Sequence, residues 1–79
     1  MLIEEAIPLL RNGSKIARVG WVKHKQYLYL LKSEAFKNLS SDVTDPVTDQ
    51  IWIRSRHGKC GPFSLAQCDL MADDWVEYK

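Results

Sequence analysis

The sequence carries almost no net charge: eleven lysine and arginine residues against ten aspartate and glutamate residues give +1 at pH 7. A protein that coats polyphosphate needs a basic excess, and an acidic mimic of nucleic acid needs the opposite. We therefore expect no nucleic acid partner. The chain also lacks an apolar run of the roughly 20 residues that cross a bilayer, and its first five residues include two glutamates, unlike a signal peptide. We expect no membrane partner and an intracellular protein.

Motifs of metal binding and catalysis are scarce as well. Cys60 and Cys68 are predicted to be reduced, buried or half-buried thiols rather than a disulfide. Together with His24 and His57 they lack the paired spacing of a zinc site, so we predict no metal. Gly13-Ser14-Lys15 lacks the upstream glycine of a phosphate-binding loop and reads instead as a helix end followed by a strand. We therefore expect neither an enzyme nor a cofactor.

The 79 residues fit a single domain, 1–79, and 46% of them are hydrophobic, which is ordinary for a globular chain. A domain of this size buries only about 60–65% of its unfolded surface. Its single core leaves a stability of only a few kcal/mol, which small chains often supplement by disulfides, metals or self-association. Self-association is the expectation here.

Residues 3–12 form an amphipathic segment that predicts a helix. Ile3, Ala6, Ile7 and Leu10 share one face, with acidic residues in the first turn and Arg11 in the last. Asn12-Gly13 is a natural end, because glycine readily adopts the left-handed conformation that closes a helix. Pro8 removes one backbone hydrogen bond, a cost that stays small if the helix begins at Ile3 or Glu4.

Alternating and aromatic-rich segments predict the strands. They lie at residues 16–21, ending near Gly20, and at 27–31, 50–56, 60–63 and 75–78. Within 50–56, Ile51 and Ile53 fall on one face, and Trp52 and Arg54 on the other. A long polar loop is predicted over 33–49.

The last quarter of the chain predicts a turn at Pro62 and a short capped helix. Ser64 and Gln67 have the spacing of a capping box. The expected apolar face of this helix is Leu65, Cys68, Met71 and Ala72, with Asp69, Asp73 and Asp74 off it. The order of elements predicts an α+β fold: a small antiparallel sheet with an N-terminal helix and a short C-terminal helix.

Trp21 is the aromatic residue with the most suggestive surroundings. It follows Gly20 at the predicted end of a strand that carries Arg18, and a lysine-bearing segment comes next. An apolar ring beside fixed positive charge suits a nucleobase attached to phosphate, because the ring stacks on the base and charge-assisted hydrogen bonds reach the phosphate. The alternatives are a core or subunit contact for the ring and a solvated surface charge for Arg18.

Two segments together carry a resemblance to a known family. They read Arg-x-Gly-Trp over residues 18–21 and Gln-x-Asp-x-x-Ala-x-Asp-Trp over residues 67–75, with Glu4-Glu5-Ala6 and Pro62-Phe63 in matching order. The chain resembles the Thoeris anti-defence type-two family of small phage proteins. The resemblance implies an α+β homotetramer that binds a glycocyclic ADP-ribose immune signal without cleaving it. It also implies action in the cytoplasm of the infected bacterium, where holding the signal blocks activation of the bacterial effector.

The resemblance further implies roles for five residues. Trp21 is expected to stack on a base or ribose, and Arg18 and Lys25 to bind phosphate. Gln67 and Asp69 are expected to hydrogen-bond ribose hydroxyls or a base edge, although Gln67 is equally explained by the capping box.

The chain departs from the usual pattern of the family near these residues. Ala66 and Cys68 stand where two hydroxyl side chains are usual, Phe63 replaces a tryptophan, and 22–25 replaces a tight Asn-Gly-Lys turn. Alternative functions follow: capture of cyclic di- or trinucleotides, which some members bind at a separate site, inhibition of a host protein by direct contact, or an enzyme that degrades the nucleotide.

Overall fold

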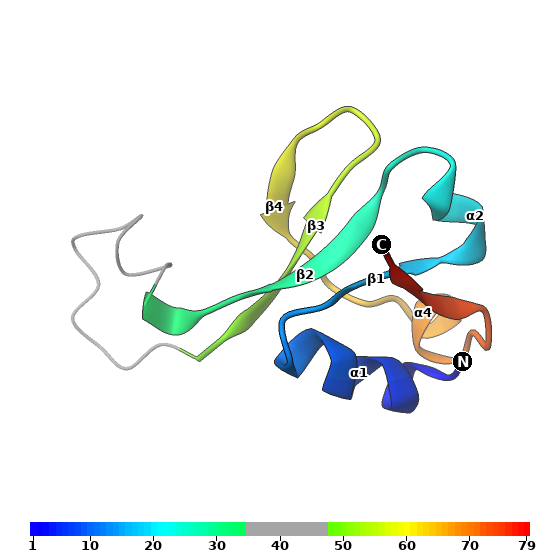
Figure 1. Ribbon diagram of the computed structural model, residues 1–79, viewed down its shortest axis with the longest axis horizontal. Coiled ribbons are helices and arrows are strands. Elements are labelled where there is room, and N and C mark those ends of the chain that lie inside the picture. The colour runs from blue at the N-terminus through cyan, green and yellow to red at the C-terminus, as the bar shows by residue number, and fades with distance from the viewer. Residues whose placement is uncertain (35–47) are drawn as a thin grey trace.

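The computed structural model describes residues 1–34 and 48–79. Its strands are β1 (Lys15–Arg18), β2 (Tyr27–Leu31), β3 (Gln50–Arg54), β4 (Cys60–Pro62) and β5 (Trp75–Tyr78). They form one antiparallel sheet in the order β4-β3-β2-β1-β5 (Figure 1). The helices are α1 (Ile3–Arg11), α2 (Val19–Val22) and α4 (Gln67–Leu70). The predicted α+β class is confirmed.

Helix α1 forms as the sequence predicts. It ends at Arg11, and Gly13 has the left-handed φ of 93° that follows such an end. The carboxylate of Glu5 accepts a hydrogen bond from the backbone N–H of Leu2 at 3.1 Å, which satisfies one donor that the first turn leaves free. In the part of the chain that the structure describes, no helix has both the length and the apolarity needed to cross a membrane.

The hairpin of β2 and β3 is the most extensively paired part of the sheet. Five residue pairs join the two strands, from Tyr27↔Arg54 to Leu31↔Gln50. Because side chains alternate along a strand, this register places Ile51 and Ile53 on one face and Trp52 and Arg54 on the other, as predicted. The turn that leads into β4 contains Gly58, which has a φ of 80°.

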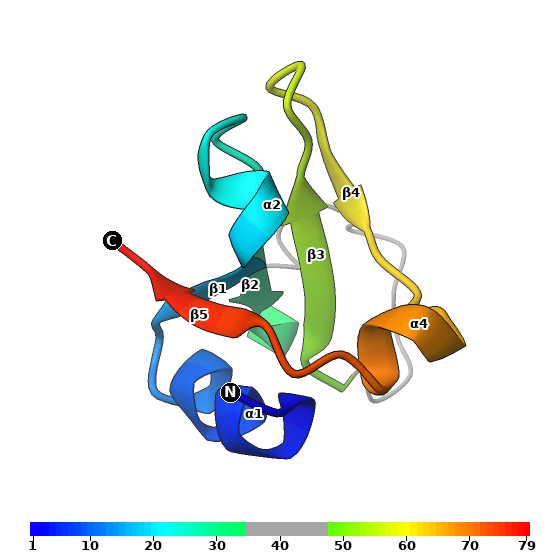
Figure 2. The same ribbon diagram turned by 90° about the vertical axis from the view of Figure 1, so that its right-hand side faces the viewer.

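The two faces of the sheet differ in what covers them. The core lies on one face, against which α1 packs from below in Figure 2; its fully buried side chains are Ala6, Leu10, Ile16, Leu28 and Trp75. The register places a different set on the opposite face, which we call the tyrosine face: Lys15, Tyr27, Tyr29, Trp52, Arg54 and Tyr78. All of its members except the exposed Lys15 are half-buried.

The predicted end of the first strand is wrong. Strand β1 stops at Arg18, and the next four residues form α2, so Trp21 lies in a helix rather than at the end of a strand. Tertiary packing explains the change: Trp21 packs against the core between Phe63 and Trp75, a position that an extended backbone would not give it.

The predicted capping box of the last helix is wrong, and its predicted apolar face is confirmed only for Leu65 and Ala72, which pack against the core. Helix α4 begins at Gln67 after Ala66, which makes no side-chain cap, so Ser64 lies too far ahead to cap it. The other two members of that face, Cys68 and Met71, are exposed, whereas Asp69 is buried. Asp69 faces inward because its backbone and side chain both have partners there, as described below.

Both cysteines are free and exposed, which corrects the expectation of buried or half-buried thiols. The absence of a disulfide between them agrees with their predicted reduced state. The predicted loop over 33–49 falls largely on residues 35–47, which lie outside the described residues.

Candidate functional site

Arg18, the last residue of β1, binds two aspartates from the other end of the chain. Its Nε donates to Oδ1 of Asp74 at 2.9 Å, and its Nη2 donates to Oδ2 of the same carboxylate at 3.5 Å. Its Nη1 donates to Oδ1 of Asp69 at 3.2 Å. We call Arg18, Asp69 and Asp74 the arginine cluster; it ties β1 to α4 and to the segment that enters β5.

Trp75 fixes Asp69 from the other side. Its Nε1 donates to the backbone carbonyl of Asp69 at 2.9 Å, and its indole is fully buried. The side chain of Asp69 is only 12% exposed. A buried carboxylate needs a charged or hydrogen-bonded partner, and Arg18 provides it. The position of α4 therefore depends on both contacts.

Trp21 packs against two aromatic rings, one of which belongs to Trp75, the residue that binds Asp69 of the arginine cluster. Its ring centroid is 5.5 Å from that of Trp75 and 6.0 Å from that of Phe63, with interplanar angles of 84° and 78°. Edge-to-face contacts of this kind are favourable and restrict the ring. The side chain is half-buried, so part of the indole stays accessible while its orientation is held.

The electrostatics of the arginine cluster favour its paired form. Hydrogen bonding to Asp74 is the main cause that raises the pKa of Arg18, and the same bond is the main cause that lowers the pKa of Asp74. With one cation and two carboxylates the cluster carries a charge of −1. Arg18 uses three of its five N–H donors on the aspartates, and its side chain is 29% exposed.

The structure places the other two predicted residues away from this contact. Gln67 opens α4 and is exposed, two residues before Asp69. Lys25 is exposed in the loop after α2, where it has a left-handed φ of 56°. Its carbonyl accepts a hydrogen bond from Nη1 of Arg54 at 2.8 Å, so Lys25 is tied to β3 rather than to the arginine cluster.

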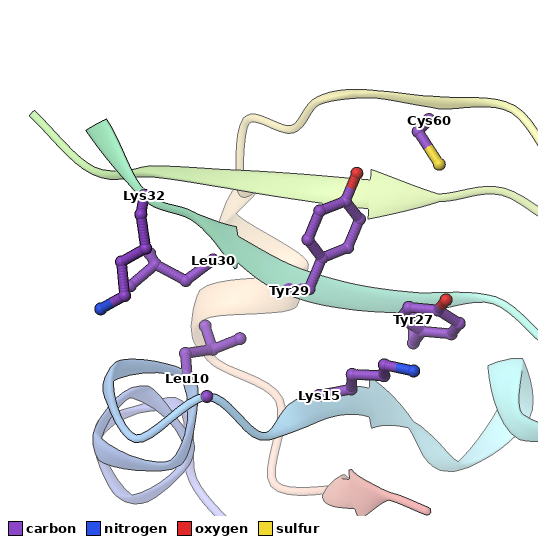
Figure 3. Close-up of a pocket in the computed structure, with 8 residues that line it drawn as sticks. Leu10, Lys15, Tyr27, Tyr29, Leu30, Lys32 and Cys60 are labelled. Atoms are coloured by element: carbon purple, nitrogen blue, oxygen red, sulfur yellow. The ribbon is translucent and has the colours of Figure 1, made fainter. Parts of the chain in front are cut away.

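Two cavities lie elsewhere in the described residues. One, of about 320 Å³, opens beside β1 and β2 and includes Lys15, Tyr27 and Tyr29 (Figure 3). The other, of about 550 Å³, lies against α1 and β3. None of the five predicted site residues lines either cavity, and the described residues hold no cluster of three metal-ligating side chains.

Comparison with known proteins decides the family. The family model for the Thoeris anti-defense 2-like domain matches residues 1–78. A phage protein, "Thoeris anti-defense 2" of Bacillus phage SP01, is 30% identical over 84 residues, which cover 95% of this chain and 91% of the relative. The chain belongs to the Thoeris anti-defense 2-like family. The resemblance stated from the sequence is confirmed, and it assigns the chain to phage anti-defence against the Thoeris system.

Within this Thoeris anti-defense 2-like domain, sequence reasoning missed the structural importance of Asp74 and Trp75. The sequence indicates them as members of the motif over residues 67–75, with Trp75 also opening a predicted strand. It predicts that Asp74 lies off the apolar face of the last helix. The adjacent Asp-Trp pair in the motif is the signal that could have indicated this role. Asp74 binds Arg18, and Trp75 binds the carbonyl of Asp69. The family motif over 67–75 therefore encodes a tertiary contact as well as a helix.

Proposed function

We propose that the protein sequesters a cyclic nucleotide immune signal of the glycocyclic ADP-ribose type, without cleaving it, in the cytoplasm of the infected bacterium. Membership of the Thoeris anti-defense 2-like family supports action against this defence system. The observation that carries the binding proposal is the held, partly accessible indole of Trp21, which packs on Trp75; Trp75 in turn binds Asp69, the ion-pair partner of Arg18. Sequestration requires affinity rather than turnover: about −8 to −12 kcal/mol gives micromolar to nanomolar binding.

In this proposal Trp21 stacks on a base or ribose, and Arg18 offers its remaining N–H donors to phosphate. Because the arginine cluster carries a charge of −1, phosphate binding requires a further cation. We propose Lys25 for this role: Arg54 holds its backbone carbonyl away from the cluster, but its long side chain is exposed. Exposed Gln67 hydrogen-bonds a ribose hydroxyl or base edge. Asp69 accepts from a ribose hydroxyl through Oδ2, since Oδ1 is occupied by Arg18.

We further propose that a second copy of the chain completes the pocket, within a homo-oligomer that the family resemblance makes a tetramer. Large apolar side chains are exposed in α2, which follows Arg18, and at the end of α4, which holds Asp69. These are Val19, Val22, Leu70 and Met71, the last 82% exposed. Burying apolar surface at about 25 cal/mol per Å² drives association, and a contact here would enclose Trp21 between two subunits.

Calorimetric titration of the purified protein with glycocyclic ADP-ribose tests the binding proposal. Trp21→Ala should weaken binding by about 5- to 150-fold, the equivalent of about 1–3 kcal/mol of stacking, whereas Trp21→Phe should lose less because it keeps an aromatic face. Circular dichroism must show that both variants are folded. Equal affinity of Trp21→Ala and the parent protein would rule out the stacking role.

Light scattering of the eluting protein tests the subunit contact. The parent chain should elute as an oligomer, and Met71→Lys should shift it toward the monomer, because it places a charge where apolar contact is proposed. Glu4→Lys, an exposed change on α1, is the matched control. A parent chain that is monomeric while it still binds the ligand tightly would contradict the shared pocket.

A further inference from the structure

The tyrosine face presents aromatic rings on adjoining strands. Tyr27 and Tyr78 lie with ring centroids 4.7 Å apart, and Tyr27 and Tyr29 lie 6.1 Å apart. Trp52 is directly opposite Tyr29 in the register of β2 and β3, and its Nε1 donates to Oε1 of Gln50 at 3.0 Å. The rings of Tyr27, Tyr29 and Tyr78 therefore form an apolar platform, and the neighbouring strand, about 4.8 Å away, places Trp52 next to Tyr29.

The cations of this face sit directly against its rings. Nζ of Lys15 lies 4.7 Å from the centroid of the Tyr27 ring, and Cζ of Arg54 lies 6.0 Å from it. Residues 15–33 and 50–68, which include strands β1 to β4, contain no aspartate or glutamate. Glu77 of β5 pairs with Ile16 in the register and therefore belongs to the other face.

A cavity of about 320 Å³ opens beside the platform, where β1 and β2 share the single register pair Ile16↔Leu28 (Figure 3). Lys15, Tyr27 and Tyr29 contribute to its wall. Burial, together with the side chain of Cys60, raises the pKa of Tyr29 to about 12, so its phenol stays protonated and able to donate a hydrogen bond. Lys32, which also lines the cavity, forms an exposed ion pair with Asp49 at 3.7 Å. Because its charge is paired, we do not include it among the cations of the tyrosine face.

We propose that the tyrosine face binds single-stranded nucleic acid, with bases stacked on Tyr29 and Trp52 and phosphates bound by Lys15 and Arg54. Stacking rings flanked by cations are the features that bind single strands irrespective of sequence. The strands that the structure describes place no carboxylate side chain on this face. A second copy of the chain fits this face poorly, because pairing two such faces would bring Lys15 and Arg54 against like charges. The net charge of +1, on which the expectation of no nucleic acid rested, is a sum over the whole chain and does not describe the charge of this face.

This inference uses neither Trp21 nor the arginine cluster of the proposed sequestration; the one link between the two sites is the hydrogen bond from Arg54 to the carbonyl of Lys25. Fluorescence anisotropy of a labelled 12-nucleotide oligothymidylate, titrated with the full chain in 50 mM salt, is the test. Two phosphate contacts predict a slope of log affinity against log salt of about −1.4, so 200 mM salt should weaken binding about sevenfold. Lys15→Gln and Arg54→Gln should each weaken binding and flatten the slope. Arg11→Gln, which removes an exposed cation on α1, should leave both unchanged.

A matched pair of variants separates stacking from folding. Tyr29→Phe keeps the ring and should retain the affinity within about twofold, whereas Tyr29→Leu removes it and should lose about fivefold or more. Circular dichroism of each variant must match the parent chain. Four results would overturn the proposal: no binding up to 100 µM protein, equal loss in Arg11→Gln, equal affinity for a 12-base-pair duplex, or full competition by AMP at the nucleotide concentration of the oligomer.

Discussion

Arg18 donates to both carboxylate oxygens of Asp74, a residue 56 positions further along the chain, at 2.9 and 3.5 Å. The backbone carbonyl of Asp74 also accepts from the N–H of Val19 at 3.1 Å. One aspartate thus binds the side chain that ends β1 and the first backbone donor of α2. Because Trp21 follows within the same short helix, the position of its ring depends on this contact.

The buried aspartate of the cluster should matter for stability. Asp69→Asn replaces an ion pair with a hydrogen bond from the charged guanidinium to a neutral amide, at a side chain that is 12% exposed. It should lower the free energy of unfolding by about 1–2 kcal/mol. Asp73→Asn, an exposed neighbour, should change it by less than about 0.5 kcal/mol. Urea unfolding followed by tryptophan fluorescence measures both; equal effects of the two substitutions would refute the structural role of Asp69.

The arginine contact should make stability depend on acid pH. Hydrogen bonding to Arg18 holds the pKa of Asp74 below its usual value of about 3.9, so the contact stabilises the folded state above that value. The stabilisation is lost as the pH falls below about 4, when the unfolded state takes up a proton that the folded state resists. Asp74→Asn should therefore melt below the parent chain at pH 7, and the gap should narrow toward pH 2.5. A gap that widens as the pH falls would contradict this assignment.

The phenol of Tyr29 should ionise at a higher pH than that of an ordinary tyrosine. Burial, with Cys60 beside it, raises the pKa of Tyr29 to about 12. Absorbance at 295 nm should show a phenol that titrates near pH 12 in the parent chain and is missing in Tyr29→Phe. Because the unfolded phenol ionises near pH 10, the folded state should lose stability as the pH rises from 10 toward 12. A parent titration that Tyr29→Phe leaves unaltered above pH 11 would show the assignment to be wrong.

Two glycines should respond in opposite directions to the same substitution. Gly13 has a φ of 93°, so Gly13→Ala forces a left-handed alanine and should cost about 1 kcal/mol of stability. Gly20 lies in α2 with open space around its Cα, and Gly20→Ala should add about 0.4–1 kcal/mol by restricting the unfolded chain. Thermal melts compare the two; loss of stability at both positions would count against the described conformation of α2.

Most of the sheet and the first helix could be predicted from local sequence. Alternation set the faces of residues 51–54, and Asn12-Gly13 marked the end of α1, because both signals depend only on neighbouring residues. The orientation of α4 could not be read in this way. Asp69 faces inward because Trp75 and Arg18, which is 51 residues away, bind it there. The local periodicity of the sequence cannot predict such long-range contacts.

The candidate site, like the fold, could be predicted from the sequence only in part. The family motif pointed to Arg18, Trp21 and Asp69, and the structure brings these three together through Trp75. It did not indicate that Arg18 is already paired with two carboxylates, nor that Lys25 is tied to Arg54. Both facts depend on the fold. Because two carboxylates already neutralise Arg18, phosphate binding needs a further, exposed cation.

Recovery of intact ligand tests sequestration most directly. The purified protein is incubated with glycocyclic ADP-ribose, the free ligand is removed by ultrafiltration, and the retained fraction is heated and analysed by mass spectrometry. Sequestration predicts depletion of free ligand by the parent chain, release of the unaltered molecule on heating, and weaker depletion by Trp21→Ala. An altered product would make the protein an enzyme, and no depletion by the folded parent chain would contradict sequestration of this signal.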